Sequence, residues 1–588
     1  MADDLLNNTK TYPRMAHWFD PVLLLQLLNN VVLSSMFGQY ADRRLMIAAL
    51  DTASPEEHAR RAEKFRSRLQ PDGAGGVWID WVADLGDGFD STYAMASLLA
   101  RSEIKLGGVL LPRGQALVMG GDEVYPKATK DAYFNQLRQP YAWAAPDPDR
   151  KDDEGRPLLA IPGNHDWYDG LVLFLALFCK EKPWHVGAWR SYQRRSYFAV
   201  RLTETWWLWA TDIQLADDMD GPQADYFKHI AASMPENSRI ILCSAEPGWL
   251  YTDSNRSSWQ IMEYAAGIAI NAGRGHTIPV LLSGDTHHYS RYVGKNDRQY
   301  VTSGGGGAFL HPTHQLEQDV SVNFVDHREG LKLGTMPDPE DARKTSAAAY
   351  PSFAASRRLT WRNAFFALTN WDFSLLMGGI YLLFAMLLSL RDRPDTYLLI
   401  AAVFGASLIG YTVKQEASRK FKIWGSAAVH AAAHVVVLIV AARYAIAFDQ
   451  QHFNWSGAWW EVWVWFGLLA VEMVPVGFLV GSTLFGLNML ITCLLFRMNR
   501  NDAFSSLRIG AYNNFLRFRL TDEGFDMYAV GLERVPSRKG WTANTKHDRT
   551  RPDPEIPVFV PVRELEPHLI EKVSVRFALS GVPHPATD

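Results

Sequence analysis

The chain has 588 residues, more than one hydrophobic core ordinarily holds, so at least two domains are expected. Its formal net charge at pH 7 is only −4, which gives no indication of a nucleic-acid partner. The three cysteines are too few and too far apart for a disulfide framework, which favours a reducing compartment. The chain begins MADDLLNN, acidic where a secretory signal is basic, so no cleavable targeting peptide is predicted.

Residues 1–75 are predicted to form an N-terminal helical or interfacial segment. Within it, Pro21–Phe37 is apolar but carries Gln26, Asn29 and Asn30. A helix that lies on a membrane or on the protein core therefore fits this stretch better than a spanning helix.

Residues 76–315 alternate short β-rich runs with helical or polar segments, which is typical of a mixed α/β domain. Most of these runs end in a loop that holds Asp, Asn, Glu or His. Because loops at one edge of a sheet can gather such side chains, a site is expected there. The predicted strands are Val77–Ala83, Ala116–Met119, Leu158–Ile161, Tyr197–Leu202, Trp206–Ala210, Ile240–Cys243, Val280–Leu282 and Gln299–Thr302.

Residues 316–371 are expected to be a connector, and residues 372–497 a transmembrane helical bundle. The stretch Ala458–Phe496 is too long for one comfortable span, and its first half is rich in tryptophan and holds Glu461 and Glu472. That half is expected to be interfacial or partly buried, with two spans as the alternative. The four predicted spans are Ser374–Leu390, Thr396–Val413, Trp424–Phe448 and Val476–Phe496.

Basic residues flank these spans unevenly. Arginines precede the first span and follow the last, and lysines and an arginine separate the second from the third, whereas residues 449–457 contain no Lys or Arg. With four spans, the positive-inside rule then places both termini and the α/β domain in the cytoplasm. Within the third predicted span, His430 and His434 share one helical face; a hydrogen-bonded pair inside the bundle is favoured over a cofactor site.

Residues 498–588 are predicted to form a small tail that contains β-structure. Two β-like runs, Asn514–Leu520 and Met527–Glu533, surround a turn signal at residues 521–524. A strand pair that docks on the α/β domain would explain this pattern.

Five short motifs that carry metal-binding side chains follow β-like runs. The most informative is GNHD at Gly163–Asp166, which places an amide oxygen beside an imidazole. The others are ADLGD at Ala83–Asp87, GGDEVY at Gly120–Tyr125, SAEP at Ser244–Pro247 and GDTHH at Gly284–His288.

Hydrolysis of a phosphate ester requires a strong nucleophile and positive charge to offset the charge that builds up on phosphorus. Two metal ions about 3.5–4 Å apart supply both, because they lower the pKa of a shared water and hold the phosphoryl oxygens. Such a pair needs one bridging carboxylate and several oxygen or nitrogen ligands. The chain offers Asp84, Asp122, Tyr125, Asn164, Glu246, Asp285 and His287 as this set.

With these motifs in order, residues Val77–Leu310 resemble the calcineurin-like metallophosphoesterase superfamily, whose motifs run DxH or DxG, GD, GNHD or GNHE, a lone His and GHxH. The resemblance implies a four-layer αββα sandwich with a dinuclear metal site. It implies that Asp84 binds the first metal, that Asp122 bridges both metals and that Asn164 binds the second. His165 would donate a proton or contact phosphate, with Asp166 orienting it.

This sequence departs from the family pattern at three motifs. DLG lacks the histidine of DxH, and the GDxxY spacing that ends at Tyr125 is similar to the purple acid phosphatase branch. Tyr125 would then bind trivalent iron, although a buried structural tyrosine fits equally well, and Asp87 is another replacement for the missing histidine. Ala245 or Glu246 stands in place of the lone histidine.

The GHxH motif has become GDTH, with Asp285 in the first histidine position and His287 in the second. An oxygen-rich ligand set favours manganese, iron or magnesium over zinc. Loss of the second metal and of activity is the competing explanation. His311 and His314 are weaker candidates for substrate contact, and His288 is expected to be a surface imidazole. The four glycines at Gly304–Gly307 either approach phosphate or form a tight turn.

Taken together, the sequence predicts a membrane-anchored phosphoesterase that acts on a phosphate mono- or diester, with a lipid-linked phosphate as one option. The alternatives are a catalytically degenerate membrane sensor or scaffold, and a transporter with a regulatory phosphoesterase domain. The oligomeric state stays open.

Overall fold

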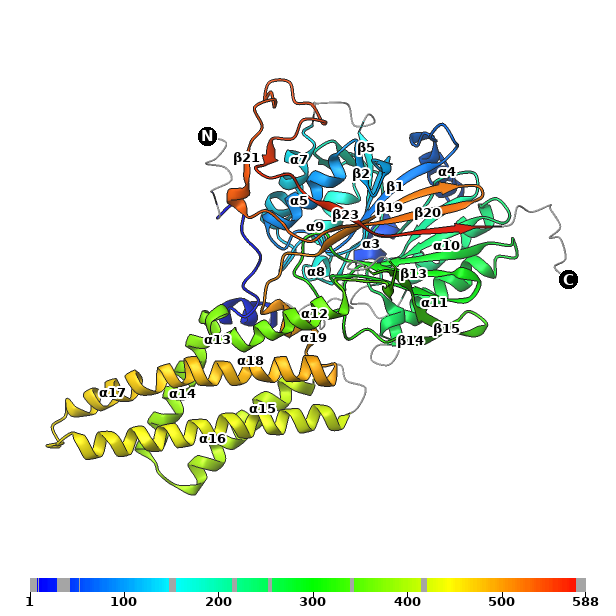
Figure 1. The fold of residues 1–588 in the computed structure, drawn as a ribbon. Coiled ribbons are helices and arrows are strands. Elements are labelled where there is room, and N and C mark those ends of the chain that lie inside the picture. Colours follow the sequence, from blue (N-terminus) through cyan, green and yellow to red (C-terminus); the bar gives the residue numbers. More distant parts are fainter. Residues whose placement is uncertain are drawn as a thin grey trace. The chain divides into compact units, whose positions relative to one another are not determined.

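The computed structural model describes residues 8, 10–28, 43–51, 53–147, 155–213, 219–251, 256–338, 343–413 and 420–577. The chain divides into two compact units, which are shown in Figure 1. Unit 1 comprises Met1–Ala16, Leu27–Phe353 and Gly510–Asp588, and unit 2 comprises His17–Gln26 and Ala354–Ile509.

Unit 1 contains an eight-stranded sheet with the order β23-β20-β19-β1-β4-β5-β7-β6. Strands β1, β4, β5 and β7 run parallel, and β19 pairs antiparallel with β1. The strands are β1 Val77–Val82, β4 Ala116–Met119, β5 Arg156–Ala160, β6 His185–Val186, β7 Trp189–Ser191, β19 Asn513–Thr521, β20 Gly524–Leu532 and β23 Pro567–Arg576.

The second large sheet of unit 1 has nine strands in the order β14-β15-β12-β13-β11-β10-β9-β8, with β18 paired to β12. Its strands are β8 Phe198–Arg201, β9 Trp206–Ala210, β10 Arg239–Cys243, β11 Thr277–Ser283, β12 Tyr289–Val293, β13 Gln299–Ser303, β14 Asp319–Phe324, β15 His327–Leu333 and β18 Ala349–Tyr350. All eight predicted strands are present in the two sheets, so the mixed α/β class is confirmed.

The helices of unit 1 pack against these sheets. They include α3 Arg43–Leu50, α4 Pro55–Lys64, α5 Phe89–Ala100, α6 Lys130–Ala132, α7 Gln139–Ala144, α8 Asn164–Trp167, α9 Val172–Phe178, α10 Gly221–Ser233 and α11 Arg256–Ile270. Three buried hydrophobic clusters follow from this packing. One combines strands of the eight-stranded sheet with α5, α7 and α9, a second combines strands of both sheets, and a third combines the nine-stranded sheet with α10 and α11.

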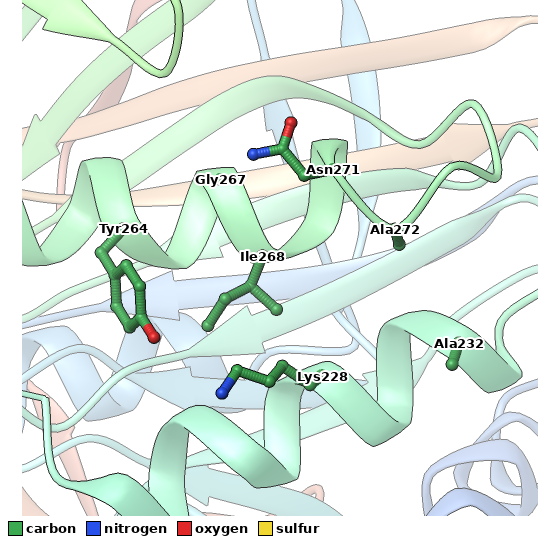
Figure 2. Close-up of a pocket in the computed structure, with 7 residues that line it drawn as sticks. All are labelled: Lys228, Ala232, Tyr264, Gly267, Ile268, Asn271 and Ala272. Atoms are coloured by element: carbon green, nitrogen blue, oxygen red, sulfur yellow. The ribbon is translucent and has the colours of Figure 1, made fainter.

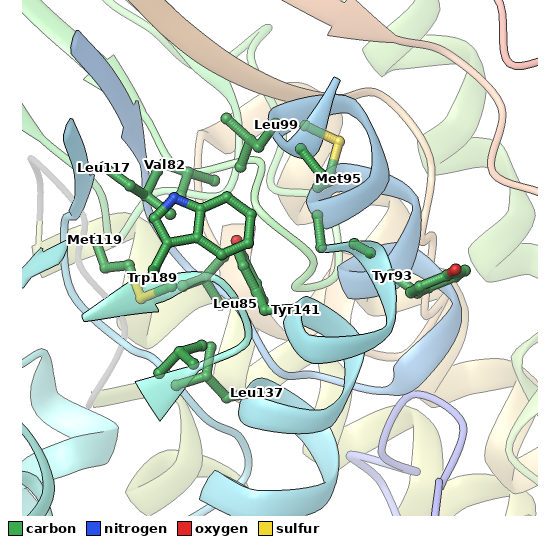
Figure 3. Packing of buried hydrophobic residues seen from close by; sticks show 14 of the residues in the cluster. Val82, Leu85, Tyr93, Met95, Leu99, Leu117, Met119, Leu137, Tyr141 and Trp189 are labelled. Atoms are coloured by element: carbon green, nitrogen blue, oxygen red, sulfur yellow. The ribbon is translucent and has the colours of Figure 1, made fainter. Parts of the chain in front are cut away.

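The first of these clusters is shown in Figure 3. The indole of Trp189 packs beside Val82 and Leu117 from the sheet, with Leu99 and Tyr141 contributed by the covering helices. This packing explains why β1 and β4 are buried on both faces and are apolar throughout, apart from Asp80 in β1.

The C-terminal tail supplies three strands of the eight-stranded sheet. The predicted hairpin is present as β19 and β20, and β19 pairs with β1 from Val77 opposite Leu520 to Trp81 opposite Leu516. A buried ion pair locks this register: the Arg517 guanidinium donates to both carboxylate oxygens of Asp80, at 2.7 and 2.8 Å. Their side chains are only 0% and 3% exposed.

Two segments differ from their expected form. Residues 316–371, expected to be a connector, contain the hairpin β14–β15, which extends the nine-stranded sheet through β12. They also contain helical segments: α12 Phe353–Thr360, η5 Trp361–Phe365 and α13 Phe366–Thr369. Of the predicted N-terminal helix, residues 21–28 are helical, and residues 29–37 lie outside the described part of the chain.

Within its described residues, unit 2 contains four helices that are long and apolar enough to cross a membrane: Trp371–Leu390, Pro394–Tyr411, Phe421–His452 and Glu461–Phe496. The first three match predicted spans. The first half of Ala458–Phe496, expected to be interfacial or partly buried, forms α17 Glu461–Pro475, in which Leu469 and Met473 are buried. Because α17 continues through η6 Val476–Gly481 into α18 Ser482–Ile491 and η7 Thr492–Phe496, the fourth long helix begins earlier than the predicted span Val476–Phe496. The helix passes Pro475 because the next turn is a π-helix, which accommodates the missing N–H.

The two histidines of the third long helix are hydrogen-bonded as predicted. Their Nε2 atoms lie 3.1 Å apart, and the Tyr381 hydroxyl from α14 Trp371–Leu390 lies 2.9 Å from Nδ1 of His434. His430 and His434 are 4% and 0% exposed. The polar pair therefore joins two helices inside unit 2.

Candidate functional site

Three aspartates that follow the ends of three strands form the centre of the candidate site. Asp84 follows β1, Asp122 follows β4 and Asp285 follows β11. All three adopt the left-handed backbone conformation, with φ angles of 60°, 51° and 65°. Non-glycine residues seldom adopt it, and such strain is concentrated at functional sites. Because each left-handed residue reverses the chain sharply after its strand, the three loops can approach one another.

Hydrogen bonds show that the three loops meet. The backbone N–H of Asp285 donates to both carboxylate oxygens of Asp84, at 2.9 and 3.1 Å. The Tyr125 hydroxyl lies 2.9 Å from Oδ2 of Asp122 and 3.1 Å from Oδ1 of Asp84. It also lies 2.9 Å from Nε2 of His287. One hydroxyl therefore contacts three of the predicted ligands.

Small residues allow this close approach. A Cβ at Gly163 would clash with the Asp122 carboxylate, so the GNHD loop reaches Asp122 only because residue 163 is glycine. Gly121 has a φ of +117°, and a Cβ there would lie 2.7 Å from Cβ of Ala245. The loops after β4, β5 and β10 therefore lie against one another.

The glycine run at Gly304–Gly307 has a packing role. Side chains there would clash with the Asp84 carboxylate, Asn514, the Ala83 carbonyl and Thr92, in that order. The backbone of this loop packs directly against these four residues, so the chain needs four consecutive residues without a side chain there.

His165 and Asp166 lie beside Asp122, and Asp166 was expected to orient His165. The ring of His165 is oriented by the Pro126 carbonyl, 2.8 Å from Nδ1. Asp166 instead accepts hydrogen bonds from the backbone N–H groups of Gly163 and Glu123, at 2.9 and 3.2 Å. Helix α8 starts at Asn164, so the Asp166 carboxylate turns back toward its N-terminal N–H groups. Asp166 thus holds the loop, and the loop places His165.

His165 is bound to Asp122 through its backbone, since its N–H donates to Oδ1 of that residue at 2.9 Å. Its ring lies 4.3 Å from the ring of Tyr125, measured between centroids. Burial lowers the pKa of His165 to about 4. Its imidazole is therefore neutral near pH 7, and because Nδ1 donates to the Pro126 carbonyl, Nε2 is the nitrogen that can accept a proton.

His287 is held in a similar way. Its Nδ1 lies 2.6 Å from the Phe309 carbonyl, which directs Nε2 toward Tyr125 and Asp84. Burial, and then the charge of His311, lower the pKa of His287, so it too is neutral. A neutral imidazole with one nitrogen bonded to a carbonyl is the usual form of a metal-binding histidine.

The weaker histidine candidates also lie in this region. His311 stacks on His287 with ring centroids 4.1 Å apart. His288 is only 3% exposed, so the expectation of a surface imidazole is wrong. His314 is 7% exposed.

Asn164, Glu246 and Asp87 have other described contacts. The Asn164 amide donates to the Tyr168 hydroxyl at 3.2 Å, one turn along the same segment. Ala245 lies against Gly121 in the loop after β4, and Glu246 is partly exposed. The Asp87 carboxylate accepts a hydrogen bond from the Ala16 N–H at 3.1 Å, which ties down the N-terminal segment of unit 1.

Three residues of the site escaped the sequence analysis. The Tyr251 hydroxyl donates to Asp285 at 2.8 Å, and the Tyr133 hydroxyl donates to Asp166. Glu123 is fully buried, and burial and the neighbouring Asp166 raise the pKa of its carboxyl well above the ordinary value. The sequence signal for Glu123 was its position in the middle of GGDEVY, directly after an apolar strand, because an acidic residue that is buried there needs a partner.

The charges around the aspartates are mutually repulsive. Burial, and then the charges of Asp122 and Asp285, raise the pKa of Asp84. Burial, and then Asp166 and Asp285, raise that of Asp122. Burial and these carboxylates also raise the pKa of Tyr125, which stays protonated. Clustered buried carboxylates of this kind need protons or cations to offset their charge.

The donor set therefore fits metal ions in its chemistry. Within the described residues, however, no three His, Cys, Asp or Glu side chains are arranged as ligands around one point. The contacts above give the physical reason: the Tyr125 hydroxyl, which is not one of these residue types, lies between Asp84, Asp122 and His287. Binding of a cation among them would require this hydroxyl to move or to become a ligand.

A surface pocket of about 370 Å³ lies elsewhere in unit 1, between helices α10 and α11. Figure 2 shows Lys228 and Ala232 on one helix facing Tyr264 and Ile268 on the other. None of the predicted site residues lines this pocket.

No protein-family model and no curated protein matches the chain. Among solved structures, it is similar to one described as "Structure of PhoD", with 10% identity and a TM-score of 0.26. The match covers 40% of this chain and 58% of that one. The residues themselves define the class of protein: a mixed α/β unit with a buried aspartate cluster, and a second unit whose described residues include four helices of membrane-spanning length.

Proposed function

We propose that unit 1 is a metal-dependent phosphoesterase of the calcineurin-like type, anchored in a membrane by unit 2. The observation that carries the proposal is the convergence of three left-handed aspartates on the Tyr125 hydroxyl and His287. The buried clusters on both sides of each large sheet support a four-layer αββα order. A cytoplasmic location of unit 1 and both termini follows from the charge asymmetry of the loops.

In this proposal Asp84, Tyr125 and His287 hold one cation, Asn164 and Asp285 help to hold a second, and Asp122 bridges them. Glu246 is the weakest of the predicted ligands. Bound cations would supply a nucleophile from water and offset charge on the phosphoryl group. The oxygen-rich set favours manganese, iron or magnesium.

The protein's own residues supply the positioning. Asp166 holds the GNHD loop by its N–H groups, and the loop presents the neutral imidazole of His165 next to Asp122. From there His165 can contact the substrate's phosphate or transfer a proton to the leaving oxygen. The substrate is a phosphate mono- or diester, and membrane anchoring makes a lipid-linked phosphate one option.

The direct test is hydrolysis by the purified full chain in detergent. A panel of an aryl phosphate monoester, an aryl phosphate diester and phosphatidic acid is assayed with Mn²⁺ and with EDTA. Metal-dependent turnover of any member supports the proposal. Bound metal without turnover of any member supports a non-catalytic sensor, the alternative favoured by Ala245 in place of the lone histidine.

Metal binding is expected to stabilise unit 1 more at pH 8 than at pH 5.5. Because the folded-state pKa values of Asp84 and Asp122 are raised, protonation of these carboxyls favours folding at low pH, and that stability is lost as pH rises through their folded pKa values. At high pH a bound cation offsets the charge of the deprotonated carboxylates, whereas at low pH protons compete with the cation for these groups. Scanning calorimetry of EDTA-treated protein, with and without Mn²⁺, measures the difference. An equal Mn²⁺ effect at both pH values would contradict this account.

Tyr125→Phe is expected to lower metal affinity and activity about 10- to 100-fold, because the hydroxyl between the carboxylates is lost. Metal analysis after dialysis and the hydrolysis assay measure both effects. If Tyr125 binds trivalent iron, the variant also loses the visible absorption of the iron-loaded protein. Tyr141→Phe is the matched control, since its buried hydroxyl has no hydrogen-bond partner among the described residues. Equal metal affinity and activity in the two variants would show that Tyr125 does not bind the metal.

A further inference from the structure

An amphipathic segment of unit 2 leads into its first long helix. Residues 354–371 are helical through α12, η5 and α13 and run up to α14. One stripe of this segment is buried, with Leu359, Asn363 and Phe366 at 7%, 0% and 0% exposure. The segment is therefore packed within unit 2 along one side only.

The opposite stripe exposes large apolar side chains. Trp361, Phe365 and Leu368 are 61%, 63% and 66% exposed, at the spacing of one helical face. Trp371, at the start of α14, is 55% exposed. Exposed aromatic and aliphatic side chains in one contiguous patch mark a surface that is covered by another phase or molecule.

The same side of the segment carries cations. Arg357, Arg358 and Arg362 are exposed, and no Asp or Glu occurs between residues 353 and 371. No ion pair joins these arginines to an acid within the described residues. An exposed face with three unpaired guanidinium groups beside tryptophan and phenylalanine is complementary to a surface with anionic groups above an apolar layer.

A second short helix also exposes apolar side chains. Residues 21–26 lie in unit 2 and expose Val22 and Leu25 to 64% and 69%. The preceding Phe19 is 7% exposed and packs against Phe366, with ring centroids 5.2 Å apart. The two helices are therefore anchored at one place in unit 2, and together they form what is here called the collar, residues 21–26 and 354–371.

We infer that the collar is a binding surface for anionic lipid headgroups. The aromatic and aliphatic side chains lie at the level where headgroups meet acyl chains, and the three arginines bind lipid phosphates. Continuity with α14 favours a membrane as the one occupant. The exposed apolar stripe passes from Leu368 and Trp371 directly to Leu375, which is 53% exposed on the candidate span. The inference rests on the proposed membrane anchoring and is independent of phosphoester hydrolysis.

The test uses the full chain reconstituted in phosphatidylcholine vesicles that contain phosphatidylglycerol. Electron paramagnetic resonance of spin-labelled lipids measures the preference of the protein for phosphatidylglycerol over phosphatidylcholine. Each basic residue near an anionic surface contributes about a fivefold preference. We expect the wild-type protein to prefer phosphatidylglycerol severalfold, and R357Q/R358Q/R362Q to lose most of this preference. High salt should weaken the wild-type preference in the same way.

The matched control is R391Q/R393Q in the loop after α14, where Arg391 is already paired with Asp395. It is expected to keep the wild-type lipid preference. Size-exclusion chromatography and Mn²⁺ binding by unit 1 show that each variant is folded. An unchanged preference in the folded triple variant overturns the inference, and a change in oligomer mass without a change in preference identifies the face as a protein contact.

Two further measurements separate this inference from the proposed function. Resistance to carbonate extraction from vesicles tests membrane anchoring, and a chain that is extracted overturns both the anchoring and the collar. Hydrolysis of a soluble aryl phosphate in detergent tests the phosphoesterase, and its failure leaves the lipid result unaffected.

Discussion

Asp122→Asn is expected to reduce phosphoester hydrolysis about a thousandfold and to weaken metal binding, while the protein stays folded. Asp122 contacts both the Tyr125 hydroxyl and the GNHD loop, through Oδ2 and Oδ1 respectively. Replacing one carboxylate oxygen with an amide removes the charge that holds cations together but keeps the side-chain shape. Steady-state hydrolysis and metal content of the purified variant measure the two effects.

Asp131→Asn is the matched control for this variant. Asp131 is exposed on the short helix α6, in the same loop region after β4, and is expected to leave both quantities unchanged. Wild-type turnover by Asp122→Asn would show that the aspartate cluster is not the catalytic centre. Loss of turnover with unchanged metal content would assign Asp122 a role other than bridging.

Arg517→Leu is expected to destabilise unit 1 by about 3–5 kcal/mol, because it leaves the Asp80 carboxylate buried without its cation. The lost contacts are the two hydrogen bonds to Asp80 and one to the Leu111 carbonyl, 3.0 Å away. Since β19 lies between β1 and the rest of the tail, the three tail strands are expected to detach together. Thermal unfolding followed by circular dichroism, with limited proteolysis of the tail, measures this.

Arg519→Leu provides a matched control two residues along the same strand. Its partner Asp72 and its own side chain are 29% and 20% exposed. Because solvent compensates for the lost ion pair, the free energy of unfolding is expected to fall by only about 0–1 kcal/mol. The double variant Arg517→Leu/Asp80→Leu should recover much of the lost stability, because no unpaired charge stays buried. Equal destabilisation by the two single variants would contradict the account of the buried pair.

The strands and spans were predictable because their signals are local. The continuous apolar run of β4 and the lengths of the helices after residue 370 depend on neighbouring residues alone. The first half of Ala458–Phe496 was expected to be interfacial or partly buried because it is rich in tryptophan and holds Glu461 and Glu472, and in the structure it is the first part of one long helix. The carboxylate of Glu461 accepts hydrogen bonds from the N–H groups of Ser456 and Gly457 just before the helix, and the π-turn accommodates the proline.

The sequence by itself determined which residues are available for chemistry: Asp84, Asp122, Asn164, His165 and Asp285 each follow a predicted strand, because strand ends are marked by local apolar patterns and turn residues. Only the tertiary structure decided how they are used. The left-handed turns of the aspartates, the contact of Ala245 with Gly121, and the orientation of His165 by a carbonyl all depend on residues far apart in the chain. The same holds for the tail, whose strands join β1 through the Arg517–Asp80 pair: hydrogen bonds and close packing between distant segments leave no periodic pattern in the sequence.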